Sequence, residues 1–151
     1  MNGVPERVGY AAGVGFIVLG GLVAAVTGPL HFDRGSWLAA YLVLVCGVAQ
    51  CAISHQRRIL RAAPLRPAQQ WVLFGCWNTG NALVVAGALV SIPVITDAGG
   101  FLLVAGLVLA GAGTRHAQRP IAVALLRTFY LVLVVSIPVG LVLSHLRAGY
   151  A

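Results

Sequence analysis

Residues 9–30 read "GYAAGVGFIVLGGLVAAVTGPL", a continuous apolar segment without a charged side chain. About 20 helical residues cross a hydrocarbon core of about 30 Å, so this segment is long enough to span a membrane. A single arginine, Arg7, precedes it, and the segment is longer than the apolar region of a typical secretory signal. We therefore predict a retained transmembrane helix.

Four further apolar runs follow the first. They cover residues 36–54, 70–95, 98–114 and 121–144. Of the 151 residues, 60% are hydrophobic and only 9% are charged, whereas roughly a quarter of a soluble domain is charged. We predict an all-α integral membrane protein, a single bundle of five transmembrane helices that forms one domain over residues 1–151. Four helices is the alternative, because run 98–114 is the shortest.

The charged residues indicate an orientation. The chain has ten arginines, no lysine, three acidic residues and a formal net charge of +7. In the five-helix topology, all the arginines except Arg34 and Arg147 fall on one side, which the positive-inside rule assigns to the cytoplasm. We predict a multi-pass protein of a bacterial plasma (inner) membrane, with a cytoplasmic N-terminus and an external C-terminus. Aromatic residues do not interleave with the arginines, so we expect no nucleic-acid binding.

Small residues repeat along three of the runs at spacings that place them on one helix face. Between helices in lipid, close backbone approach is a main source of association. These residues therefore predict either tight packing within the bundle or docking onto another membrane subunit or a second copy. They are Gly13, Gly20, Ala24 and Gly28 in the first run, Cys76, Gly80, Gly87 and Ser91 in the third, and Gly99, Gly106, Ala110 and Gly113 in the fourth.

Polar residues of the first and third loops and the last helix end share the predicted external surface. They are His31, Asp33, Asp97 and His145. Two imidazoles and two carboxylates at one depth could bind copper or zinc, and His31 with His145 could ligate a haem iron. In the alternative interpretation, both histidines are interfacial residues and Asp33 pairs weakly with Arg34 or caps the second helix, as Ser36 could also do.

The stretch "GCWNTGN" at residues 75–81 places amides near the middle of the third predicted helix. Polar groups in hydrocarbon need partners, and Gln50 of the second helix is the expected partner of Asn78 and Asn81. Trp77 and Asn81 are four residues apart, so they could line a small-molecule pocket. The alternative is interhelical hydrogen bonding worth about 0.6 to 2 kcal/mol.

Soft metal ligands occur near the predicted cytoplasmic end of the second helix. Cys51 and His55 are four residues apart, and Cys76 of the third helix could lie at similar depth. Three such ligands could hold a metal ion. Buried thiols and a histidine at the membrane boundary explain the same residues.

A basic segment, "HQRRILRAAPLR", follows the second run. It could hold anionic lipid headgroups at roughly 1 kcal/mol per arginine, or it could act only as a determinant of topology. The arginines in question are Arg57, Arg58, Arg61 and Arg66.

These observations leave three functional hypotheses. The apolar runs contain no acidic residue of the kind that carries protons, and the chain has no phosphate-binding glycine loop or nucleophile elbow, so we do not expect an enzyme. We favour a structural or accessory subunit that packs on a partner membrane complex. The alternatives are a haem- or metal-binding redox or sensing module that uses His31 and His145, and a small transporter or channel with a polar pocket around Gln50.

Overall fold

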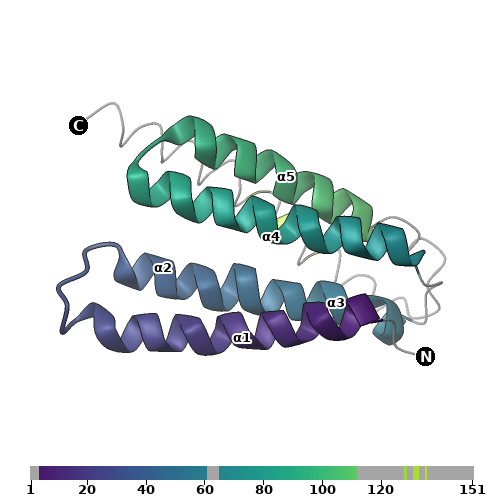
Figure 1. Ribbon diagram of the computed structural model, residues 1–151, viewed down its shortest axis with the longest axis horizontal. Helices are drawn as coiled ribbons and strands as arrows, with labels where there is room; N and C mark the ends of the chain where they lie inside the picture. The colour runs from purple at the N-terminus through teal and green to yellow at the C-terminus, as the bar shows by residue number, and fades with distance from the viewer. Residues whose placement is uncertain (1–3, 61–64, 112–127, 129–130, 133–134, 136–151) are drawn as a thin grey trace. The chain divides into compact units, whose positions relative to one another are not determined.

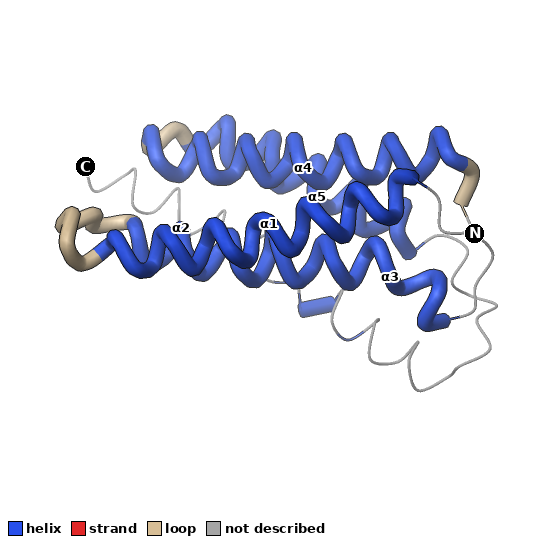
Figure 2. Tube along the Cα trace, turned by 60° about the horizontal axis from the view of Figure 1, so that its bottom comes forward, coloured by secondary structure: helices blue, strands red, loops and turns tan. Residues whose placement is uncertain are grey.

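The computed structural model describes residues 4–60, 65–111, 128, 131, 132 and 135, with the side chains of residues 57–60 excluded (Figures 1 and 2). This part of the chain contains helices and no strand. Four helical segments are long and apolar enough to cross a membrane: Val4–Thr27, Gly35–Gln56, Pro67–Val90 and Pro93–Gly111. The predicted all-α, multi-pass membrane fold is therefore confirmed. Most of the fifth predicted run, 121–144, lies outside the described residues.

The chain divides into two compact units, residues 1–55 and 56–151, and each is described by itself. In the first, α1 (Val4–Thr27) runs antiparallel to a second helix, as Figure 1 shows. That second helix consists of α2 (Gly35–Tyr41), η1 (Leu42–Ala49) and α3 (Gln50–Leu60). We call residues 4–55 the first hairpin. In the second unit, α4 (Pro67–Val90) and α5 (Pro93–Gly111) form the second hairpin.

Glycines bring the two helices of the first hairpin close to backbone contact. A Cβ atom added to Gly13 would lie 2.6 Å from the Sγ of Cys51 and 2.9 Å from the carbonyl oxygen of Gly47. One added to Gly20 would lie 2.9 Å from the carbonyl oxygen of Ala39. Both approaches are too close for a side chain, so the predicted packing role of these two glycines is confirmed.

Ala24 and Gly28, which we predicted on the same stripe, are exposed. The helix α1 ends at Thr27, where the side-chain hydroxyl donates to the carbonyl of Val23 at 2.6 Å. Gly28 therefore lies in the turn beyond the helix rather than on its packed face. The buried small residues of α1 lie nearer its start, at Pro5, Gly9, Gly13 and Gly20.

Residues 28–34 form the turn between the helices of the first hairpin. The amide of Phe32 donates to the carbonyl of Thr27 at 3.1 Å, and the amide of Gly35 donates to Phe32 at 2.8 Å. The N-cap of α2 is Arg34, with no side-chain hydrogen bond to the helix. The predicted cap at Ser36 is therefore wrong, because Ser36 already lies within α2 and backbone hydrogen bonds in the turn begin the helix earlier.

The middle of the second span is a π-helix, η1, with its wider i to i+5 hydrogen-bond pattern. Its glycine, Gly47, faces α1, where an added Cβ would lie 2.5 Å from the Cγ1 of Ile17. Leu42, Cys46 and Ala49 of η1 are also buried. The π segment thus contributes the middle of the face of the second span that packs against α1.

The boundary between the third and fourth predicted runs lies earlier than expected. Ser91 ends α4 in the left-handed conformation, with φ of 58°, and the amide of Ile92 donates to the carbonyl of Gly87 at 2.9 Å. Pro93 then begins α5, as its ring favours the first position of a helix. Asp97, which we predicted in a loop, is therefore a residue of α5.

The second hairpin also closes on glycines. A Cβ atom on Gly99 would lie 2.7 Å from the carbonyl oxygen of Gly80 and 2.7 Å from the amide nitrogen of Val84. One on Gly87 would lie 2.6 Å from the amide nitrogen of Thr96. The predicted roles of these three glycines in helix packing are confirmed.

Candidate functional site

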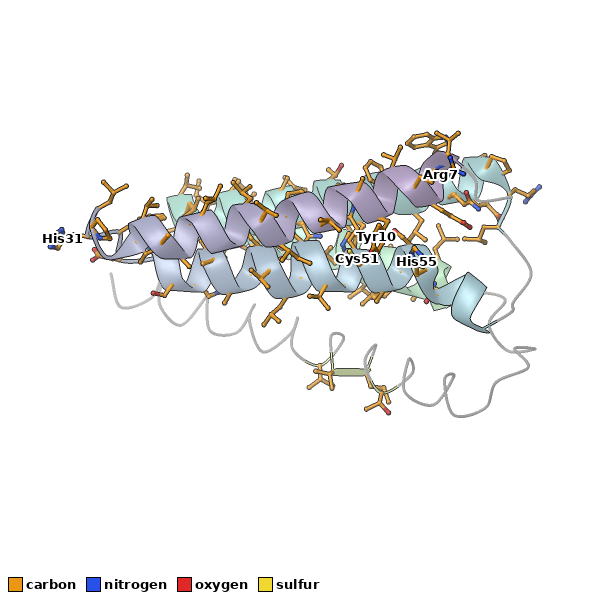
Figure 3. The ribbon with its side chains drawn as sticks, turned by 90° about the horizontal axis from the view of Figure 1, so that it is seen from below. Arg7, Tyr10, His31, Cys51 and His55 are labelled. Carbon is orange, nitrogen blue, oxygen red and sulfur yellow. The ribbon has the colours of Figure 1, made fainter. Side chains whose placement is uncertain are left out.

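The polar residues predicted at the external surface are divided between the two units of the chain. His31 and Asp33 are exposed in the turn of the first hairpin. Figure 3 shows His31 at the opposite end of α1 from Arg7. Asp97 belongs to α5 of the second hairpin, and His145 lies outside the described residues. Within those residues no group of three or more His, Cys, Asp or Glu side chains could hold a metal ion.

The amides of the predicted polar pocket bond within their own units. Gln50 belongs to the first hairpin, whereas Trp77, Asn78 and Asn81 belong to the second. The Nδ2 of Asn78 donates to the carbonyl of Phe74 at 2.8 Å, and the Nδ2 of Asn81 donates to the carbonyl of Trp77 at 2.9 Å. Both bonds reach back four residues along α4, so each engages an amide donor within the same helix.

Trp77 and Asn81 are both buried, as their shared helix face predicts. The indole of Trp77 covers the glycine face of α5, where a Cβ on Gly106 would lie 3.7 Å from its Cε3. Its Nε1 is buried without a hydrogen-bond partner among the described residues. Trp77 therefore packs the second hairpin, and the contact with Gly106 is ordinary van der Waals packing.

Little of the basic segment is described. Arg57 and Arg58 belong to α3 by their backbone, and Arg61 lies outside the described residues. Arg66 is exposed at the N-cap of α4, where its amide donates to the Oε1 of Gln69 at 3.2 Å. Binding of lipid headgroups by this segment stays a prediction.

A polar cluster lies in the first hairpin at the place where the start of α1 meets α3. We call it the Tyr10 cluster; it consists of Tyr10, Gln50, Cys51 and His55, three of which Figure 3 labels. The Nε2 of Gln50 donates to the carbonyl of Gly9 at 3.2 Å. The thiol of Cys51 donates weakly to the carbonyl of Tyr10 at 3.7 Å. The rings of Tyr10 and His55 lie 4.6 Å apart between centroids, tilted by 54°.

Two polar atoms of the Tyr10 cluster are buried without a hydrogen-bond partner among the described residues. They are the Oε1 of Gln50 and the Nδ1 of His55. The Gln50 side chain is only 3% exposed. A buried polar atom without a partner costs roughly 1–3 kcal/mol, so its presence in a folded protein calls for an explanation, of which a bound ion is one. The Tyr10 cluster is therefore the strongest candidate site in the described structure.

Sequence reasoning identified part of this cluster. The spacing of Cys51 and His55 was visible, and we grouped these two residues with Cys76, which belongs to the second hairpin; that grouping stays a prediction. The structure places Tyr10 beside Cys51 and His55. The only signal for Tyr10 was an aromatic residue near the start of the first run. No protein-family model, curated protein or solved structure matches the chain.

Proposed function

We propose that this protein is a non-catalytic accessory subunit that packs on a partner membrane complex. The observation that carries this proposal is that the intramembrane amide side chains donate hydrogen bonds to backbone carbonyls within the fold. Gln50 bonds across the first hairpin, while Asn78 and Asn81 bond to their own helix. Each of these bonds uses an amide donor to hold the fold, which suits a structural subunit better than a transport pathway.

Close packing at glycines supports the same role. At Gly13 and Gly20 the two helices of the first hairpin approach almost to backbone contact. The helices of the second hairpin do the same at Gly80 and Gly99. Large apolar side chains of α1 then point outward, where they suit contact with acyl chains or with an apolar partner helix. They are Val4, Val8, Val14, Val18, Leu22 and Val26.

The arginines support a location in a bacterial plasma membrane with the N-terminus in the cytoplasm. Because the helices of the first hairpin are antiparallel, Arg7 lies at the end of the hairpin from which α3 continues to Arg57 and Arg58. Arg34 lies in the turn at the other end. Three basic residues against one are consistent with the positive-inside rule.

Purification from the native membrane tests the accessory role. A tagged full-length chain, extracted in a mild detergent such as digitonin, should migrate as a complex with a second membrane protein in a fixed ratio. A tag on that second protein should recover this chain in the same ratio. Recovery of this chain alone, as a monomer or as a homo-oligomer, would contradict the proposal.

A further inference from the structure

Two soft ligands of the Tyr10 cluster share one helix face. Cys51 and His55 are four residues apart on α3, and both contact Tyr10, one through its carbonyl and the other through its ring. Side chains at this spacing are neighbours on a helix surface. Pairs of ligands four residues apart hold a single metal ion in known helical sites. The two side chains therefore share one face of α3 beside Tyr10.

The donor atoms of these two side chains are available to an ion. The Cys51 thiol acts as the donor in its contact with Tyr10, so the lone pairs of its sulfur are not engaged by that bond. The Nδ1 of His55 is buried with no hydrogen-bond partner in the described structure. Gln50 is 97% buried, and its Oε1 also has no hydrogen-bond partner in the described structure. The cluster thus presents lone pairs that the described part of the chain does not satisfy.

The opposite helix leaves room for the sulfur. A Cβ atom on Gly13 would lie 2.6 Å from the Sγ of Cys51 and 3.1 Å from its amide nitrogen. Any larger residue at position 13 would therefore displace the thiol. The absence of a side chain there lets the Cys51 sulfur lie between the helices next to Tyr10.

The chemistry of the ligands indicates which ion they suit. Thiolate is a soft ligand that selects Cu(I), and imidazole also binds copper. Structural zinc takes four ligands, whereas no group of three or more His, Cys, Asp or Glu side chains that could hold a metal occurs among the described residues. Cu(I), a soft d¹⁰ cation, is stable with two ligands. We propose that Cys51 and His55 bind Cu(I) inside the first hairpin, independently of the accessory role.

Binding involves no change in oxidation state. The thiol of Cys51 releases its proton to solvent as the copper–sulfur bond forms, and its hydrogen bond to Tyr10 is lost. The Nδ1 of His55 donates its lone pair to the ion, with the ring proton on Nε2. The Tyr10 ring lies beside the imidazole, with 4.6 Å between the ring centroids.

Anaerobic titration of the purified full-length protein tests the site. Cu(I) is supplied in competition with the chromophoric chelator bathocuproine disulfonate, and we expect the protein to retain about one equivalent. Cys51→Ser and His55→Gln should each weaken retention by at least about tenfold. The matched controls Cys76→Ala and His31→Gln change the same residue types outside the cluster and should retain copper as the wild type does.

X-ray absorption at the copper edge decides the question even if a variant fails to fold. The wild-type protein loaded with Cu(I) should show one sulfur and one nitrogen neighbour. A spectrum without sulfur would overturn the proposal. So would wild-type retention in both cluster variants, a protein that retains no copper, or stoichiometric zinc binding in preference to Cu(I).

Discussion

At the scale of single residues, the contact of Gly20 with the second span makes a sharp test of the packing. An alanine Cβ there would lie 2.6 Å from the Cγ2 of Val43 and 2.9 Å from the carbonyl oxygen of Ala39. The β-branched valine and the backbone cannot both move aside cheaply. We expect Gly20→Ala to lower the free energy of unfolding by about 1–3 kcal/mol, measured by denaturant titration in detergent.

The neighbouring glycine provides the control for this variant. A Cβ on Gly21 would meet nothing within 4 Å. Gly21→Ala should therefore leave stability unchanged or raise it by up to about 1 kcal/mol, because alanine favours the helix. Equal losses in Gly20→Ala and Gly21→Ala would show that the helices do not approach as described.

The backbone of His31 gives a second test at this scale. Its φ is 49°, in the left-handed region that β-branched residues avoid. We expect His31→Val to destabilise the protein by about 1–2 kcal/mol, whereas His31→Gly should be neutral or slightly stabilising. Leu30→Val is the control, since Leu30 is exposed in the same turn and has no positive φ. Thermal unfolding of the three variants measures the difference.

The result for His31 also bears on its predicted role as a ligand. If His31→Gly unfolds at a lower temperature than the wild type by as much as His31→Val does, the imidazole itself is needed. That outcome would indicate that the imidazole of His31 makes a stabilising interaction. It would contradict a role of His31 that depends only on the backbone conformation of the turn.

At the scale of elements, the amides differ in which helix they join. Gln50 of α3 donates to Gly9 of α1, whereas Asn78 donates to Phe74 of its own helix. Interhelical hydrogen bonds in membranes are worth about 0.6 kcal/mol on average and up to about 1.7. We expect Gln50→Leu to loosen the first hairpin by about that amount, while Asn78→Leu changes stability by less than about 0.5 kcal/mol.

Disulfide trapping can measure how closely α1 and α3 of the first hairpin approach in these two variants. Paired cysteines at exposed, facing positions near the start of α1 and the end of α3 should form a crosslink more slowly in Gln50→Leu than in Asn78→Leu. Equal rates would contradict an interhelical role for Gln50. A larger effect of Asn78→Leu would point to a partner beyond its own helix and support a polar pocket.

At the scale of the whole molecule, the number of spans determines where the C-terminus lies. With five spans, a reporter fused after residue 151 lies outside the cytoplasm; with four, it lies inside. We expect alkaline phosphatase to be active in that fusion and in one within residues 28–34, but inactive in one within residues 61–66. An inactive C-terminal fusion, with a fluorescent protein active there instead, would establish four spans.

The sequence by itself determined the class of the protein and most of its spans. Each helix meets lipid individually, so length and apolar composition are sufficient to identify it. The glycines at 13, 20, 80, 87 and 99 could be assigned to packed faces for a related reason, because close helix approach in lipid requires small residues. Helix ends were less accurate. Apolar content does not report the left-handed cap at Ser91 or the helix start at Pro93.

Only the tertiary structure decided which polar residues meet. Tyr10 joins Cys51 and His55 because Gly13 and Gly47 fix how α1 lies along the second span. No periodicity in either helix specifies that register, since it depends on contacts between segments about 40 residues apart. Composition determines that a helix enters the membrane, whereas packing between helices determines which side chains form a site.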